Sequence, residues 1–302
     1  MRLPEWVRKL IEERAAEAPF AELKRGAAAL SEGYRAGRGT RGLRAPVAAY
    51  LVTRMPATYA AAYAALSRLD VQPRSLLDAG GGTGSASLAA RELFPSLETT
   101  TIFEADPRLA EAGRGFLGDA EWRIGDFTRA ELPPAGLVVA GYSLAEVRDP
   151  VAAALRLWEA ARIALVVIEP GTPRGFGTVQ AIRERLLAAG ARIAAPCPHE
   201  GACPAAGAGW CHFAARLERS SLHRRLKGGE LSYEDEKYSY MAFTREPART
   251  PQARIVRHPH TQPGQITLEL CKEGKLTSER VPRGDRERFR KARKAAWGDG
   301  WE

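Results

Sequence analysis

The chain has 302 residues, of which 45% are hydrophobic and 27% charged, a composition typical of an ordinary soluble protein. Its apolar runs are too short to cross a bilayer, so we expect no membrane partner. The formal net charge of +9 favours a polyanionic partner, nucleic acid first, over a general bias of the composition toward arginine and alanine.

Residues 1–70 are predicted to be helical, because apolar side chains recur there at helical spacing. A loop rich in glycine and arginine interrupts them, with the sequence "YRAGRGTRGLRAP". It carries four arginines and no acid: Arg35, Arg38, Arg41 and Arg44. Guanidinium groups fit phosphate oxygens, and glycine lets the backbone approach a ligand. We therefore predict contact with RNA, with a merely solvated loop as the alternative.

The N-terminal stretch "MRLPEWVRKLIEERAAEAPFAELKRG" bears on the compartment. It has no apolar signal core, and Glu12, Glu13 and Glu17 make it too acidic for a typical transit peptide. We therefore expect a protein of the bacterial cytoplasm.

Residues 71–195 alternate between short apolar runs and helical segments rich in alanine. The expected strands lie in "RSLLDAG", "ETTTIFEAD", "EWRIGDF", "GLVVAGYSL" and "IALVVIEPG". Alternation of this kind predicts an α/β fold with a mostly parallel sheet that is covered by helices on both faces.

A glycine-rich turn follows the first of these strands, in "LLDAGGGTGSASLAA". It matches neither the G-x-G-x-x-G pattern of dinucleotide enzymes nor a P-loop. The spacing Asp78-x-Gly80-x-Gly82-x-Gly84 instead resembles the first motif of class I S-adenosylmethionine-dependent methyltransferases. That resemblance implies that Asp78 and the glycine backbone surround the methionine part of the cofactor.

Two acids at later strand ends complete the expected cofactor site. Glu104 follows the second strand, where a carboxylate can accept two hydrogen bonds from the ribose hydroxyls. Asp126 follows the third strand, where such folds hold the adenine amino group. A Rossmann-like domain that binds another nucleotide, or none, is the alternative.

No catalytic residue can be assigned from the sequence. The fourth strand ends in "AGYSLAEV", which offers Tyr142, Ser143 and Glu146 but no Asp/Asn-Pro-Pro-Tyr motif. Cofactor binding can therefore be argued from the residues, whereas methyl transfer cannot.

Four cysteines indicate a metal site, and three of them lie close together in "PCPHEGACPAAGAGWCHF". They are Cys197, Cys203, Cys211 and the distant Cys271. A disulfide is not expected in a cytosolic protein, and neighbouring proline and glycine suit ligand turns. Zinc sites usually have tighter C-x2–4-C spacing, so the gaps of five and seven residues favour a [4Fe–4S] cluster. Zinc and inert thiols are the alternatives.

The end of the chain is divided between two predicted regions. Residues 196–245 form the Cys-rich insertion and return to the sheet, and residues 246–302 form a β-segment with the fourth cysteine and a basic tail. We expect turns at Pro263-Gly264 and near Gly274.

Several of these segments together resemble the methyltransferase-like assembly factors of the mitochondrial ribosomal small subunit and their bacterial relatives. They are "YLVTRMPATYAA", the cysteine block, "LHRRLKGGELSYEDEKYSYM" and "LELCKEGK". The resemblance implies a Rossmann-like class I methyltransferase fold, with a mostly parallel seven-stranded sheet, an N-terminal helical region and a Cys-rich metal-binding insertion. It also implies S-adenosylmethionine, a [4Fe–4S] cluster on the four cysteines, and binding to small-subunit rRNA. We expect the protein to act as a monomer.

The basic segments acquire a role from this resemblance. We expect the arginine loop and two further segments to grip an rRNA backbone with salt-sensitive affinity. The further residues are Arg224, Arg225, Lys227, Arg288, Arg290, Lys291, Arg293 and Lys294. Tyr233, Tyr238 and Tyr240 are predicted to pack near the cluster, with base stacking as the alternative. The function is either rRNA methylation or assembly without catalysis; a small-molecule methyltransferase fits the clustered arginines less well.

Overall fold

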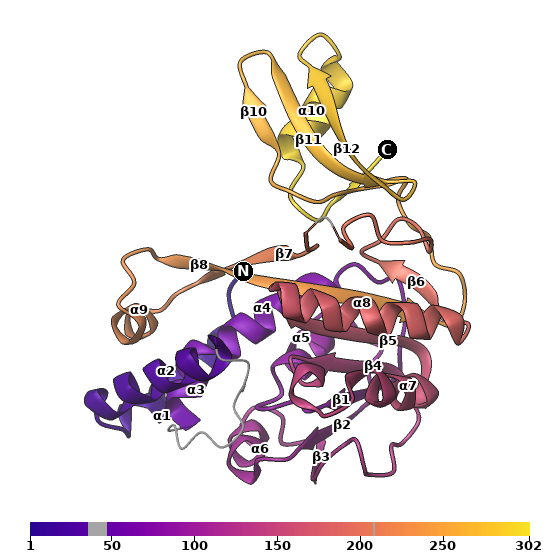
Figure 1. Ribbon diagram of the computed structural model, residues 1–302. Coiled ribbons are helices and arrows are strands. Elements are labelled where there is room, and N and C mark those ends of the chain that lie inside the picture. Colours follow the sequence, from indigo (N-terminus) through magenta and orange to yellow (C-terminus); the bar gives the residue numbers. More distant parts are fainter. Residues whose placement is uncertain (36–46, 208) are drawn as a thin grey trace.

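The computed structural model describes residues 1–35, 47–207 and 209–302 (Figure 1). A central sheet with helices on both faces is flanked by N-terminal helices, and a smaller β-rich unit stands at its far edge. None of the helices in the described ranges has the length and apolarity that a bilayer span requires.

The central sheet has eight strands in the order β3-β2-β1-β4-β5-β8-β6, and β7 pairs with β8. Their bounds are β1 (Ser75–Ala79), β2 (Thr99–Glu104), β3 (Glu121–Ile124), β4 (Ala135–Gly141), β5 (Ala161–Pro170), β6 (Arg192–Ala195), β7 (Phe213–Glu218) and β8 (Tyr233–Thr244). The first five strands pair in parallel, whereas β8 is antiparallel to its three neighbours. The strand order therefore reverses between β1 and β4, where ligands bind in open α/β sheets.

The predicted Rossmann-like α/β sheet is confirmed, with one more strand than the seven expected. The extra strand, β7, pairs with the first half of β8, from Phe213 opposite Tyr238 to Glu218 opposite Tyr233. Tyr238 also faces Pro170 of β5, so β7 lies on the edge of β8 opposite β5. Because β7 pairs with a strand that comes later in the chain, its place in the sheet could not be predicted from its own sequence.

Both faces of the sheet are buried, because successive side chains of a strand point to opposite faces. In β4, Leu137 and Val139 belong to one hydrophobic core, and Val138 and Ala140 belong to another. The first core includes side chains of α1 (Glu5–Ala16), α2 (Phe20–Arg35), α3 (Val47–Thr53), α4 (Met55–Leu66), α5 (Ser85–Leu93) and α6 (Pro107–Arg114). The second is covered by α7 (Pro150–Ala160) and α8 (Pro173–Ala188).

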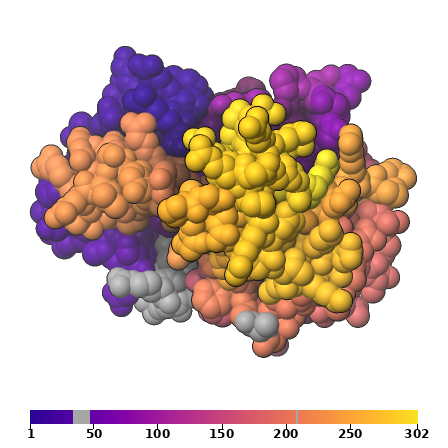
Figure 2. All heavy atoms as spheres, turned by 90° about the horizontal axis from the view of Figure 1, so that it is seen from above, coloured from indigo at the N-terminus to yellow at the C-terminus, as the bar shows by residue number. Residues whose placement is uncertain are grey.

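The C-terminal unit has its own small core. Its sheet has the order β10-β11-β9-β13, with β12 paired to β11. The bounds are β9 (Ala253–Ile255), β10 (His260–Gln262), β11 (Gln265–Lys272), β12 (Lys275–Pro282), α10 (Arg286–Lys294) and β13 (Gly300–Trp301). Both predicted turns are confirmed, since Gly264 and Gly274 join these strands with left-handed φ values of +81° and +74°. Figure 2 shows this unit from above, beside the segment that carries α9 (Ser221–Lys227).

Candidate functional site

A cavity of about 490 Å³ opens at the carboxyl ends of β1 to β4. Four of the predicted cofactor residues line it: Gly80, Gly82, Glu104 and Asp126. The position matches the point at which the strand order reverses, where such folds bind ligands. Asp78 and Gly84 do not line this cavity.

The glycine spacing is explained by the backbone of the loop. Gly80, Gly82 and Gly84 have φ values of +72°, +60° and +80°, which strain any residue with a Cβ atom. A Cβ at Gly80 would lie 2.6 Å from the Cβ of Ser143, and one at Gly82 would lie 3.0 Å from the hydroxyl of Tyr50. The loop is therefore built for close approach to its neighbours and to the cavity.

Asp78 is buried next to the glycine loop. Its side chain is 1% exposed, and Ser87 Oγ donates a 2.7 Å hydrogen bond to its Oδ2. Burial raises the pKa of this carboxyl to about 6, against the opposing effect of the Ser87 hydrogen bonds. Its Oδ1 is buried and has no hydrogen-bond partner in the described ranges.

Glu104 joins the glycine loop to the end of β2. Its Oε2 accepts a 2.7 Å hydrogen bond from the backbone N–H of Gly82, and its Oε1 accepts one of 2.8 Å from Asp106. Burial raises the pKa of Glu104, although both backbone donors oppose that rise. Each carboxylate oxygen keeps a second lone pair, so both can accept hydroxyl donors from the cavity.

Asp126 follows the neighbouring strand β3 and is more exposed than Glu104. Its Oδ1 accepts hydrogen bonds from the backbone N–H and the hydroxyl of Thr128, at 2.9 and 2.7 Å. These bonds fix the carboxylate at the end of β3. It can therefore accept a hydrogen bond from an amino group in the cavity.

Tyr142, to which no role was assigned from the sequence, forms another part of the wall, and Arg54 and Glu236 contact it without lining the cavity. Tyr142 follows β4 with a left-handed φ of +60°, and its hydroxyl donates a 3.0 Å hydrogen bond to Glu236 Oε1. Arg54 Nη2 lies 3.4 Å from the same oxygen. Burial, and then the charge of Glu236, raise the pKa of Tyr142 well above its ordinary value. The phenol is therefore a neutral hydrogen-bond donor at this wall.

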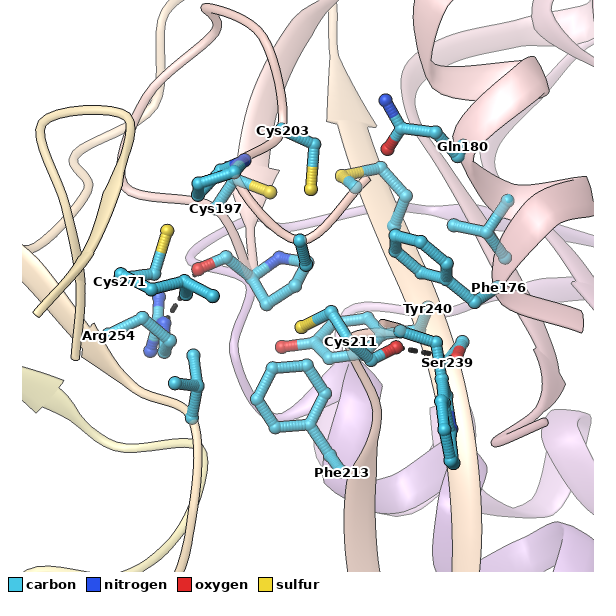
Figure 3. Close-up of a pocket in the computed structure, with 18 of the residues that line it drawn as sticks. Phe176, Gln180, Cys197, Cys203, Cys211, Phe213, Ser239, Tyr240, Arg254 and Cys271 are labelled. Atoms are coloured by element: carbon cyan, nitrogen blue, oxygen red, sulfur yellow. Dashed lines mark hydrogen bonds between the residues drawn. The ribbon is translucent and has the colours of Figure 1, made fainter. Parts of the chain in front are cut away.

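The four cysteines line a second cavity of about 140 Å³. Figure 3 shows them around this space, with Cys197 and Cys203 on one side and Cys211 and Cys271 on two others. The first three belong to the connection between β6 and β7, and Cys271 lies on β11. The cavity therefore joins this connection to the C-terminal unit. Phe213 and Tyr240 form part of its largely apolar wall.

Burial controls the chemistry of these thiols. It raises the pKa of Cys197 to about 11 and that of Cys271 to about 12, and it raises the pKa of Cys211 further. All four are free thiols. In the described ranges, no three Cys, His, Asp or Glu side chains gather closely enough to hold one metal ion.

The tyrosines of β8 divide between two places. Tyr238 and Tyr240 are buried and pack against Phe213 beside the cysteine cavity. Tyr233 lies at the other end of the strand, where Arg216 stacks 4.1 Å from its ring centroid. The prediction that all three pack near the cysteines is therefore wrong for Tyr233, because β8 is too long to bring both ends to one site.

Several basic residues predicted to bind RNA already have contacts within the chain. In α9, Lys227 pairs with Glu234 at 3.0 Å, Arg225 stacks over Phe20 at 4.6 Å, and Arg224 is half-buried. In α10, Arg288 pairs with Glu279 at 2.6 Å and Lys291 with Glu287 at 3.5 Å.

Three other predicted residues of α10 are exposed: Arg290, Arg293 and Lys294. Arg38, Arg41 and Arg44 lie outside the described residues, as does the side chain of Arg35. Among the described candidates, α10 therefore offers the most accessible group of positive charges.

Solved methyltransferases are similar to this chain at low sequence identity. Precorrin-6y C5,15-methyltransferase from Geobacter metallireducens is 16% identical with a TM-score of 0.42, and covers 61% of this chain and 87% of its own. Human N-acetylserotonin methyltransferase in complex with SAM is 18% identical with a TM-score of 0.33, over 49% of each chain.

Curated relatives extend over most of the chain. Rsm22-cox11 tandem protein 2, mitochondrial, of Schizosaccharomyces pombe is 29% identical over 324 residues, covering 84% of this chain and 42% of that protein. Human ribosome assembly protein METTL17, mitochondrial, is 27% identical over 288 residues, covering 83% and 61%. The chain thus spans roughly half the length of the curated relatives it matches.

These names correct the predicted compartment. Each of these relatives is a mitochondrial protein, which points to mitochondria and contradicts the expectation of a bacterial cytoplasm. That expectation rested on the composition of the N-terminal stretch. Such a composition alone does not determine the compartment of a protein.

The family assignment rests on most of the chain. The family model described as "Mitochondrial small ribosomal subunit Rsm22" matches residues 44–302, which include the lining of the 490 Å³ cavity, all four cysteines and the C-terminal unit. The chain therefore belongs to the Rsm22 family.

Proposed function

We propose that this protein is an rRNA-binding assembly factor of the small ribosomal subunit, with S-adenosylmethionine in the larger cavity and a [4Fe–4S] cluster among the cysteines. The observation that carries the proposal is the family match over residues 44–302. It agrees with the name of the human relative, a ribosome assembly protein. That the protein acts as a monomer stays a prediction.

The residues of the larger cavity fit S-adenosylmethionine. Glu104 is fixed by two backbone donors and keeps lone pairs for the ribose hydroxyls. Asp126 presents an acceptor for the adenine amino group, and the glycine loop leaves room for the methionine part. When bound, this cofactor supplies an electrophilic methyl group.

The donor set of the smaller cavity fits an iron–sulfur cluster. In a cluster each thiolate binds a different iron, so the ligands must be spread around a space. The four cysteines surround such a space, whereas one zinc ion requires all four sulfurs about 2.3 Å from a single point. A cluster here would tie the β6–β7 connection to β11, and so to the C-terminal unit.

A second candidate is an active rRNA methyltransferase, which the well-formed cavity of about 490 Å³ favours. Against it, the position after β4 is filled by Tyr142, whose hydroxyl is already bonded to Glu236. We therefore place assembly without methyl transfer first.

The two candidates are separated by replacing Gly82 with valine. The new side chain would meet the Tyr50 hydroxyl at a left-handed position, so S-adenosylmethionine binding, measured by calorimetry, should fall at least tenfold. Subunit maturation should also fall, while the methylation map of the small-subunit rRNA stays unchanged. The matched control is Gly177→Val, because nothing lies within 4 Å of a Cβ there.

Other outcomes of this experiment would count against the proposal. Loss of one specific rRNA methyl group in Gly82→Val cells would favour the methyltransferase. Normal subunit maturation in cells that lack the protein would contradict a role in assembly.

A further inference from the structure

Two arginines are buried beside the cysteine cavity. Arg183 of α8 is 2% exposed, and Arg254 of β9 is 5% exposed. No carboxylate among the described residues lies within 4.0 Å of either guanidinium. Because an isolated charge is costly to bury, two such groups at one site need an explanation.

Backbone carbonyls account for the positions of both arginines. Arg183 Nη2 donates hydrogen bonds to the carbonyls of Gly201 and His199, at 2.6 and 3.3 Å. Arg254 Nε donates to Pro196 at 2.7 Å, and its Nη1 donates to Gly298 at 3.0 Å. These acceptors hold the guanidinium groups against the cysteine connection, but they carry no negative charge. Arg183 Nε has no partner in the part of the chain described.

Both charges lie beside the cysteines. Arg254 lines the cysteine cavity. Arg183 is hydrogen-bonded to the carbonyls of His199 and Gly201, which lie between Cys197 and Cys203 on the connection that lines the same cavity. The two positive charges are therefore held next to the thiols.

The charges match those of a metal centre with four thiolates. A core of charge +2, either zinc or an oxidised [4Fe–4S] cluster, leaves a net charge of −2 when four thiolates bind it. The two buried guanidinium groups supply a charge of +2, and the exposed Arg257 and Glu269 of the same lining carry opposite charges. Glu200 and Asp299 act on the buried pair only from beyond 4.0 Å, so four neutral thiols would leave both arginines without a close anion among the described residues.

We infer that Arg183 and Arg254 are the buried counter-charges of a dianionic four-thiolate centre in this cavity. The inference rests on the metal centre of the proposed function and adds the residues that set its charge balance. Arg254 lies on β9, so the C-terminal unit supplies one of the two counter-charges. A cluster gains a negative charge when it is reduced, and nearby positive charges favour that state.

The test is the midpoint potential of the cluster in the full chain, reconstituted with iron and sulfide without oxygen. Arg254→Gln and Arg183→Gln should each make reduction about tenfold less favourable, a shift of about 59 mV to lower potential for one electron. Arg254→Lys and Arg183→Lys keep the charge and should retain the wild-type potential. These lysine variants also separate a loss of charge from a loss of folding.

A matched control lies on β6, just before the same connection. Arg192 pairs with Glu200 at 2.8 Å, but its side chain is 44% exposed, so water screens its charge. Arg192→Gln should leave the potential unchanged. Equal potentials for wild type, Arg254→Gln and Arg183→Gln, with full iron and sulfide content, would overturn the inference while the cluster proposal stood.

The result is different if no iron–sulfur cluster forms. A wild-type chain that takes up zinc but no iron would contradict the proposed cluster. The counter-charge inference then requires Arg254→Gln to lose zinc to a chelator about tenfold more readily than Arg254→Lys. Equal zinc retention, or a wild-type chain that binds neither metal, would overturn it.

Discussion

Glu169 is a single residue whose burial makes stability depend on pH. Its side chain is 0% exposed at the end of β5, and its Oε1 accepts backbone hydrogen bonds from Leu144 and Ala145 at 3.0 and 3.1 Å. Its Oε2 is buried and has no partner in the described ranges. Burial raises the pKa to about 8. The group therefore holds the short turn η1 (Leu144–Glu146) beside the cofactor cavity.

The sign of the pH effect follows from that raised pKa. Between about pH 5 and pH 8 the native carboxyl keeps its proton, while the unfolded chain has released it. The unfolded state then binds fewer protons, so the free energy of unfolding falls as pH rises, by at most about 1.4 kcal/mol per unit. Glu169→Gln keeps an acceptor for Leu144 and Ala145 and should lack this slope.

Urea unfolding of both proteins at pH 5, 6, 7 and 8 measures the difference. We expect the wild type to lose stability relative to Glu169→Gln over this range. Curves that stay parallel would show that Glu169 is ionised in the native protein.

Among the elements, β8 connects the two candidate sites. Glu236, near its start, holds Tyr142 and Arg54 at the cofactor cavity. Ser239 and Tyr240, further along the same strand, line the cysteine cavity. A displacement of this strand would therefore change the lining of both cavities.

The core elements could be predicted from sequence because their signals are local. Strand patterns, the left-handed glycines and the acids at strand ends each lie within a few residues, and parallel strands bring Glu104 and Asp126 to one edge. The contact between Arg54 and Glu236 has no such signal, because 182 positions separate the two residues. Their contact exists only after α4 and β8 pack together.

The link between β11 and the β6–β7 connection gives a test at this scale. Cys271→Ser removes the one candidate ligand that the C-terminal unit supplies. The variant should lose bound metal, and amide hydrogen exchange of residues 196–207 should quicken at least tenfold, because a bound metal holds these turns together.

The control for this test is Leu276→Ser, which also lines the cavity but removes no thiol. It should keep the metal and the slow exchange. Full metal content in Cys271→Ser would show that the fourth ligand is another residue.

For the whole molecule, the distribution of charge bears on the proposed contact with RNA. The net charge is +9, but many arginines are neutralised by ion pairs on the surface. Arg290, Arg293 and Lys294 of α10 are exposed and have no ion pair in the part of the chain described. The proposed RNA contact should therefore depend on α10 more than on the total charge.

Two triple variants with the same change in net charge test this prediction. Changing Arg290, Arg293 and Lys294 to glutamine should lower the slope of log affinity against log salt by about 2, since each phosphate contact contributes ~0.7 on single strands. The control changes Arg74, Arg108 and Arg123, which pair with Glu98, Asp106 and Glu121. Fluorescence anisotropy of a labelled small-subunit rRNA fragment, measured at several potassium chloride concentrations, gives both slopes. Equal slopes for the two variants would mean that RNA responds to total charge, and α10 would then have no special role.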